Sequence, residues 1–183
     1  AVYIKEPGDP IGGNEMLLIK HAHIFAPQDL GIQDILISEG HIAHIAPHIE
    51  TAPYMEITDG SGKQLTPGLI DRHVHVSGGG GEGGFATRTP EIQLSALIQA
   101  GITTVVGLLG TDGVTRSVED LIAKVKALKS EGISAYAMTG SYAYPSTTIT
   151  GSVKKDILFI DEILGVKLAL SDHRSSHLSL IHI

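Results

Sequence analysis

Two histidines, His73 and His75, stand one residue apart at the end of an apolar run, in the segment DRHVHVSGGGGEGG that spans residues 71–84. Side chains at positions i and i+2 of a β-strand face the same side, so Asp71, His73 and His75 would point one way. Two neighbouring imidazoles can hold one divalent metal ion. A pair of histidines on a solvent-facing strand is the alternative, but the apolar run before them and the glycines behind them favour a metal site.

The glycine tract and the carboxylate that ends it could contact a substrate. Residues 78–81 are all glycine and lack a Cβ atom, so the backbone of Gly80 and Gly81 could approach a ligand closely and offer N–H groups. Glu82 would then place an anion at the mouth of the site, suited to a substrate ammonium group. A flexible loop and one more solvated carboxylate are the alternatives for these two features.

Four more candidates lie within or just after other apolar stretches. Lys167 lies inside GVKLALS, where an unpaired buried ammonium would be costly. Carbamylation by CO2 would convert it into an anion able to bridge two metal ions, whereas a lysine that reaches solvent is the alternative. Arg174 suits a substrate carboxylate through a bidentate pair, or is a surface arginine. Thr111 and Tyr142 would lie on the same rim, although each alone indicates little.

The elements that would position these residues alternate between strand and helix from residue 67 onward. Such alternation, with apolar strands, predicts a parallel sheet. In a (β/α)8 barrel the active site lies at the carboxyl ends of such strands, and a closed barrel takes ~250 residues, so four strands predict only its first half. The expected strands are GLIDRHVHV, ITTVVGLLG, ISAYAMTG and GVKLALS.

Three helices are expected between these strands. Thr89 and Pro90 would open the first, as N-cap and first-turn residue. Ser117 and Asp120 resemble a capping box that opens the second. Helical spacing of apolar residues supports all three: Leu94, Leu97 and Ile98; Leu121, Ile122, Val125 and Leu128; and Val153, Ile157, Ile160 and Leu164.

Residues 16–66 show short strands and turns without a helical stripe, which predicts a small β unit. DILIS and HIAHIA flank Glu39-Gly40, a hairpin signal, and MEIT and QLT flank the turn-rich segment DGSGK.

The two ends of the chain do not match the pattern of the rest. Residues 1–15 show no period, and codons for IGGNEM can include a bacterial ribosome-binding sequence before Met16. LSLIHI, residues 178–183, can be encoded by a transposon adapter. We therefore expect a non-native or disordered leader over 1–15, a folded protein that begins at Met16, and an artefactual tail over 177–183. An ordinary disordered N-terminus and a short apolar tail are the alternatives.

Composition narrows the class of protein. The 183 residues carry a formal net charge of −7 and include no cysteine, so they can form neither a disulfide framework nor a thiolate metal site. No Lys/Arg cluster gives the electrostatic footprint of a nucleic-acid binder. No apolar run approaches the ~20 residues of a membrane span, and there is no signal-peptide pattern. We expect a cytoplasmic protein that binds neither nucleic acid nor membrane.

Beyond these patterns the chain resembles a known family from about residue 16 to residue 176. PGLIDRHVH, GITTVVGLLGTD, TRTPE, TGSY and TITGSV resemble the amidohydrolase superfamily. GGGGEGG together with GLLGTD and SDHRS resembles its bacterial isoaspartyl (β-aspartyl) dipeptidases. The resemblance implies a (β/α)8 barrel plus a small β-sandwich made by both chain ends. Residues 16–66 would be the β-sandwich portion and residues 67–176 the first half of the barrel.

The resemblance also implies two divalent metal ions, with zinc expected, and a role for each candidate residue. His73 and His75 would bind one metal ion, and Lys167, as a CO2-derived carbamate, would bridge both. The family's two further histidine ligands, a second arginine and the catalytic aspartate would lie beyond the end of this chain. The implied substrate contacts are Gly80, Gly81, Glu82, Thr111, Tyr142 and Arg174. Glu82 would bind the free α-amino group of the substrate and Arg174 a carboxylate. Tyr142 would lie beside the scissile carbonyl and also act in catalysis.

Together these features predict hydrolysis of the isoaspartyl peptide bond in dipeptides by a hydroxide that bridges two metal ions. We expect this activity in a full-length homo-oligomer and expect this chain alone to be inactive. Two alternatives stay open. One is a cyclic-amide amidohydrolase such as a dihydroorotase or hydantoinase, which shares His-x-His and the carbamylated lysine but is disfavoured by Glu82. The other is a metal-free binding module, disfavoured by the presence of both histidines and Lys167.

Overall fold

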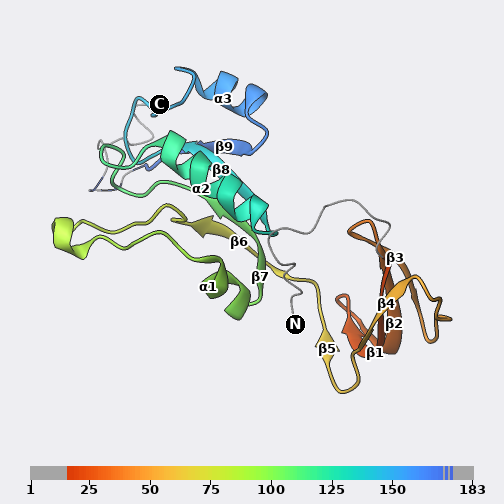
Figure 1. The fold of residues 1–183 in the computed structure, drawn as a ribbon. Helices are drawn as coiled ribbons and strands as arrows, with labels where there is room; N and C mark the ends of the chain where they lie inside the picture. Colours follow the sequence, from red (N-terminus) through yellow and green to blue (C-terminus); the bar gives the residue numbers. More distant parts are fainter. Residues whose placement is uncertain (1–15, 171, 173, 175–183) are drawn as a thin grey trace. The chain divides into compact units, whose positions relative to one another are not determined.

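Residues 16–67 form a five-stranded sheet. The computed structural model describes residues 16–170, 172 and 174, which divide into two compact units, the first ending at residue 67. The expectations for residues 1–15 and 177–183 lie outside these described residues. In the first unit β1, β2 and β3 run antiparallel, whereas β4 and β5 run parallel to β1 (Figure 1). The strands are β1 (Met16–Phe25), β2 (Asp29–Ser38), β3 (His41–Ala46), β4 (Met55–Asp59) and β5 (Gln64–Leu65).

The hairpin predicted at Glu39-Gly40 joins β2 to β3. Both residues adopt the left-handed conformation, with φ of 52° and 76°, which a two-residue turn between twisted antiparallel strands requires. The DGSGK connection joins β4 to β5, and both strands pair with β1 rather than with each other. The core of this unit is small and consists of Ala22, Ile24 and Ile35 with partly buried neighbours.

Four parallel strands form the sheet of the second unit in the order β6-β7-β8-β9, with helices in the connections (Figure 1). The predicted alternation of strand and helix is therefore confirmed. The strands are β6 (Leu69–Val74), β7 (Ile102–Gly107), β8 (Ser134–Gly140) and β9 (Ile163–Lys167). The helices are η1 (Phe85–Thr87), α1 (Leu94–Gln99), α2 (Val118–Ser130) and α3 (Val153–Phe159).

Helix α2 provides much of the core under this sheet. The Ser117 hydroxyl accepts a hydrogen bond from the Asp120 backbone N–H at 3.2 Å, so the predicted N-cap is confirmed. The apolar residues of α2 share one face because they are spaced three and four apart. That face is buried with Val105 of β7 and Ala135 of β8, and its residues are Val118, Leu121, Ile122, Val125 and Leu128.

Several predicted boundaries were wrong. The strands predicted as GLIDRHVHV and ITTVVGLLG end at Val74 and Gly107, before their last predicted residues. Helix α1 begins at Leu94, so Thr89 and Pro90 do not open it; the Thr89 N–H donates instead to the Gly79 carbonyl at 2.8 Å. Helix α3 ends at Phe159, so Ile160 and Leu164 lie beyond it. Strand β9 starts at Ile163 and ends at Lys167, earlier than GVKLALS indicated. Apolar spacing that continues across a helix end cannot mark that end by itself.

Within the described residues, no helix is both long and apolar enough to cross a membrane.

Candidate active site

The predicted site residues lie at the carboxyl ends of the parallel strands or in the segments that follow these ends. Because parallel strands end at the same edge of a sheet, this arrangement gathers residues that are far apart in sequence. His73 lies in β6, and His75 and the glycine tract with Glu82 follow that strand. Thr111 follows β7, Tyr142 follows β8, and Lys167 ends β9, with Arg174 beyond it.

The two histidines lie side by side, with ring centroids 5.6 Å apart and planes at 80°. The His75 Nδ1 atom lies 2.8 Å from the Leu108 carbonyl oxygen. A carbonyl oxygen only accepts, so Nδ1 carries the hydrogen, and in the neutral ring Nε2 keeps its lone pair. Metal-binding histidines are commonly oriented in this way by a backbone carbonyl. Gly110 also leaves room for the ring, because a Cβ atom there would lie 3.3 Å from it.

The environment of His73 favours the form of imidazole that binds metal. Partial desolvation of the ring lowers its pKa, and the positive charges of Lys167 and His75 lower it further, although Asp71 opposes them. His73 is therefore more readily neutral near pH 7 than a free histidine, and the neutral ring is the ligating form.

The donor set fits part of a metal site. His73 and His75 supply imidazole nitrogens, which suit zinc and similar ions. Among the described residues, however, no group of three or more histidine, aspartate or glutamate side chains lies close enough to hold a metal ion. Lys167 is the further candidate donor, and as an unmodified ammonium it cannot ligate. The described residues therefore match one pair of histidine ligands with a lysine nearby.

Tyr142 lies between two cations. The Lys167 Nζ atom is 5.0 Å from the centroid of its ring, and the guanidinium carbon of Arg174 is 5.4 Å from it. Both separations are within the range of cation–π attraction. Tyr142 thus connects the lysine beside the histidines to the arginine beside Glu82.

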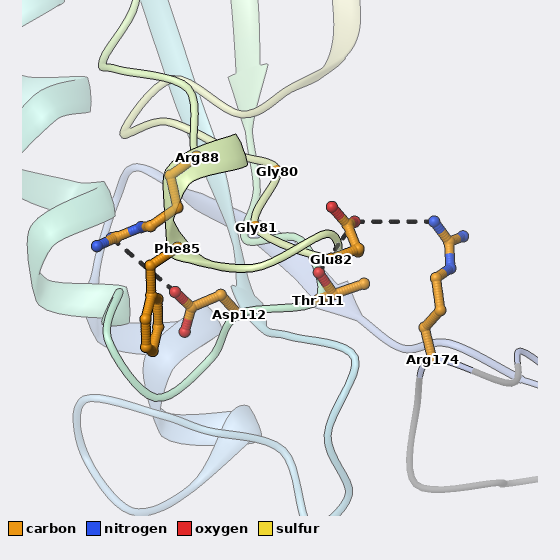
Figure 2. A pocket seen from close by; sticks show the side chains of 8 residues that line it. All are labelled: Gly80, Gly81, Glu82, Phe85, Arg88, Thr111, Asp112 and Arg174. Atoms are coloured by element: carbon orange, nitrogen blue, oxygen red, sulfur yellow. Dashed lines mark hydrogen bonds and ion pairs between the residues drawn. The ribbon is translucent and has the colours of Figure 1, made fainter.

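Glu82, Thr111 and Arg174 line one pocket of about 330 Å³ together with Gly80 and Gly81 (Figure 2). The Thr111 hydroxyl donates to a Glu82 carboxylate oxygen at 3.1 Å, and the Arg174 guanidinium lies 3.8 Å from the same carboxylate. The structure therefore brings together the five residues that the sequence proposed as substrate contacts on this side of the site. The pocket contains an anion and a cation next to each other.

Neighbouring groups hold these two residues in their charged forms. The Glu82 carboxylate accepts from its own backbone N–H and from Thr111, and these bonds, with Arg174 nearby, lower its pKa. Asp172 accepts two hydrogen bonds from the Arg174 guanidinium, at 3.0 and 2.8 Å, and raises the pKa of Arg174. At neutral pH the pocket thus offers a carboxylate for a cation and an oriented guanidinium for an anion.

The sequence interpretation missed three residues that line the pocket, Phe85, Arg88 and Asp112. The Arg88 guanidinium and the Asp112 carboxylate lie 3.9 Å apart (Figure 2). Asp112 directly follows Thr111, so its place after a strand was a signal that could have identified it. Phe85 and Arg88 lie in the segment that follows the glycine tract. Nothing in the local sequence indicated that this segment folds back toward the tract.

A buried arginine underneath the glycine tract was missed as well. The Arg116 guanidinium donates to the Ser77 carbonyl at 3.3 Å and to the Thr89 carbonyl at 2.8 Å, and so ties the two sides of the loop together. A Cβ atom at Gly78 would lie 2.7 Å from this guanidinium, so the glycine is needed there. The loop that presents Glu82 is therefore anchored from below.

Comparison with known proteins agrees with this geometry. The chain is 48% identical to a β-aspartyl dipeptidase from Fervidobacterium islandicum AW-1 solved in complex with β-Asp-Leu dipeptide; the match covers 94% of this chain and 46% of that one, with a TM-score of 0.88. It is also 36% identical over 113 residues to a dihydroorotase from Staphylococcus aureus, covering 62% of this chain and 26% of the relative. An L-hydantoinase from Arthrobacter aurescens shares the fold at 18% identity and a TM-score of 0.57, over 91% of this chain and 36% of that one. No protein-family model matches the chain.

The parallel sheet with its site at the strand ends and these relatives place the chain in the amidohydrolase superfamily. Within it, the chain is similar to the β-aspartyl dipeptidases, and it spans less than half the length of each relative named above. The predicted fold is confirmed: residues 16–67 and the four-stranded parallel sheet align with part of an amidohydrolase, and the parallel sheet corresponds to part of its barrel.

Proposed function

We propose that this chain carries the substrate-recognition residues and part of the metal site of a two-metal isoaspartyl (β-aspartyl) dipeptidase. The observation that carries the proposal is the pair of opposite charges in one pocket, Glu82 and Arg174, 3.8 Å apart. An isoaspartyl dipeptide carries a free ammonium and an α-carboxylate on the same carbon atom. Glu82 would bind the ammonium and Arg174 the carboxylate, with Thr111 holding Glu82 in place.

Three residues would hold the metal ions, His73 and His75 directly and Lys167 as its carbamate. When bound, two divalent ions, which we propose to be zinc, lower the pKa of water and polarise a carbonyl oxygen. Tyr142, whose ring lies beside Lys167, would place its hydroxyl near the scissile carbonyl and donate to its oxygen. The backbone of Gly80 and Gly81 would approach the aspartyl end of the substrate.

These three ligands are too few to hold two ions, since zinc sites use three or four protein ligands each or share bridging ones. We therefore propose that the chain by itself shows no dipeptidase turnover. We place the active protein in the cytoplasm as a homo-oligomer that uses isoaspartyl dipeptides as small-molecule substrates.

Dihydroorotase activity is the second candidate, because curated relatives of that name are 36% identical over 113 residues. Dihydroorotate carries a carboxylate but no ammonium group, so it would offer the Glu82 carboxylate no cation to bind. Glu82 is therefore the residue that discriminates between the two functions.

The recognition step can be tested on the chain itself by NMR titration with β-Asp-Leu and, separately, with dihydroorotate. We expect β-Asp-Leu to shift the backbone amide signals of Gly80, Gly81 and Thr111, and Glu82→Gln to abolish these shifts. Dihydroorotate should leave the three signals nearly unchanged. Shifts caused by dihydroorotate alone would contradict the proposal and favour the second candidate.

A further inference from the structure

The Asp156 carboxylate is fully buried in the helix that follows the loop carrying Tyr142. Asp156 belongs to α3, and its relative exposure is 0%. Its Oδ2 atom accepts from the Thr139 hydroxyl at 2.6 Å and from the Ile149 N–H at 3.0 Å. Its Oδ1 atom accepts from the N–H and the hydroxyl of Thr150, at 2.9 and 2.6 Å. One side chain therefore joins β8, the end of the β8–α3 loop and α3.

These contacts fix the loop at both ends. At its start, the Gly140 N–H donates to the Thr147 carbonyl at 2.9 Å, and Gly140 has a φ of 85°. A Cβ atom at Gly140 would lie 2.6 Å from the Lys167 carbonyl oxygen, so β8 and β9 approach closely at this point. Tyr142 follows two residues later, with its ring beside Lys167. At the far end, Ile149 and Thr150 are bound directly by Asp156.

The four groups around Asp156 favour a carboxylate. Two of them are hydroxyls and two are backbone N–H groups, and each carboxylate oxygen receives two. Burial alone would raise the pKa of Asp156, but the hydrogen bonds from Thr139, Thr150 and Ile149 outweigh it and lower the pKa, so the group is an anion. An asparagine would replace one acceptor oxygen by an NH2 group that faces a backbone N–H, which can only donate, so that N–H would lose its acceptor.

We propose that Asp156 is a positioning residue of the candidate active site. It sets the course of residues 141–150, and thereby keeps the Tyr142 ring between Lys167 and Arg174. The assignment of Tyr142 to the substrate rests on the proposed function, whereas the link from Asp156 to Tyr142 does not.

The link can be measured without substrate by labelling the chain with 3-fluorotyrosine and recording 19F NMR spectra. The Tyr142 signal is assigned with Tyr142→Phe, and the signals of Tyr54 and Tyr136 report on the first and second unit. In Asp156→Asn we expect the Tyr142 signal to move at least halfway to the position of free fluorotyrosine, or to broaden beyond detection. The other two signals should stay in place, and in Asp161→Asn, an exposed aspartate five residues on, all should be unchanged.

A second pair of variants guards against misfolding of Asp156→Asn. Thr139→Val removes one donor to Asp156 and should move the Tyr142 signal in the same direction, whereas Thr139→Ser keeps the hydroxyl and should restore it. An unchanged Tyr142 signal in a folded Asp156→Asn or Thr139→Val variant would overturn the proposal. It would also be overturned if the Tyr136 and Tyr142 signals always moved together, because Asp156 would then only stabilise the unit. A failed dipeptidase assay would leave these outcomes unaffected.

Discussion

At the scale of single residues, the candidate site depends on charged groups whose neighbours hold them in one state. Glu82 is kept anionic by hydrogen bonds from its own backbone and Thr111, and Arg174 is oriented by Asp172. His75 is oriented by the Leu108 carbonyl. None of these supporting contacts follows from residue type, because each joins the loops of different strands or depends on how a loop turns. The sequence could name the histidines, Glu82, Thr111 and Arg174, but not the support that Asp172 and the Leu108 carbonyl give.

Replacement of Glu82 by glutamine should impair substrate recognition and leave the metal site intact. The test requires an active protein, such as a chimera that continues this chain after residue 174 with the remaining sequence of the Fervidobacterium dipeptidase. Loss of the carboxylate removes a charge-assisted contact with the substrate ammonium, so kcat/KM for β-Asp-Leu should fall about tenfold or more. Glu56→Gln, on an exposed position of β4, is the control. If Glu82→Gln also lost metal, Glu82 would instead be a ligand or a structural residue.

Asp34 predicts a pH dependence for the stability of the first unit. Burial raises the pKa of this carboxylate, but the His21 and Ile49 N–H groups, at 2.9 and 3.0 Å, and Lys20 outweigh burial and lower it. A lowered folded-state pKa contributes stability above the unfolded pKa of about 3.9, and this stability is lost as the pH falls through the folded pKa. Asp34→Asn should therefore cost about 1–3 kcal/mol at pH 6–7.

The same cost should shrink as the pH falls below about 4, since protonation then removes the advantage of the wild-type carboxylate. Urea unfolding followed through NMR signals of β1 and β2 at several pH values measures this. A difference between wild type and variant that is equal at pH 7 and pH 2.5 would show that the charge of Asp34 does not stabilise the unit.

At the scale of elements, strands and the longest helix were predictable because their signals are local. β-Branched runs indicated β7, and apolar spacing with an N-cap indicated α2. The start of α1 was not predictable, because Thr89 forms hydrogen bonds with the glycine loop instead of capping a helix. Arg116 shows the same limit, since its contacts with Ser77 and Thr89 span 39 and 27 residues.

The N-cap of α2 gives a test at this scale. Ser117→Ala removes the acceptor for the Asp120 N–H and should reduce the free energy of unfolding by about 1 kcal/mol. Ser130→Ala is the matched control at the other end of the helix, where the hydroxyl donates to the Lys126 carbonyl, and should change stability by less than about 0.5 kcal/mol. Equal effects of the two substitutions in chemical unfolding would show that Ser117 does not act as a cap.

At the scale of the whole molecule, a parallel sheet supplies one edge on which residues from four strands meet. The order β6-β7-β8-β9 places the histidines and Lys167 at the ends of the two outer strands, and residues of the loops that follow the inner strands complete the rim. The sequence could predict this arrangement because parallel strands with helical crossovers share a direction. It could not predict the pocket itself, whose walls include Phe85 and Arg88 from a long loop.

We propose that the protein to which this chain belongs recognises an isoaspartyl dipeptide for metal-dependent hydrolysis. The most direct test of this proposal is turnover of β-Asp-Leu and of dihydroorotate by the zinc-loaded chimera, compared with the 183-residue chain alone. We expect leucine release from β-Asp-Leu by the chimera, little or no reaction with dihydroorotate, and no turnover of either compound by the chain alone. Preferential hydrolysis of dihydroorotate by the chimera, or turnover by the chain alone with stoichiometric zinc, would contradict the proposal.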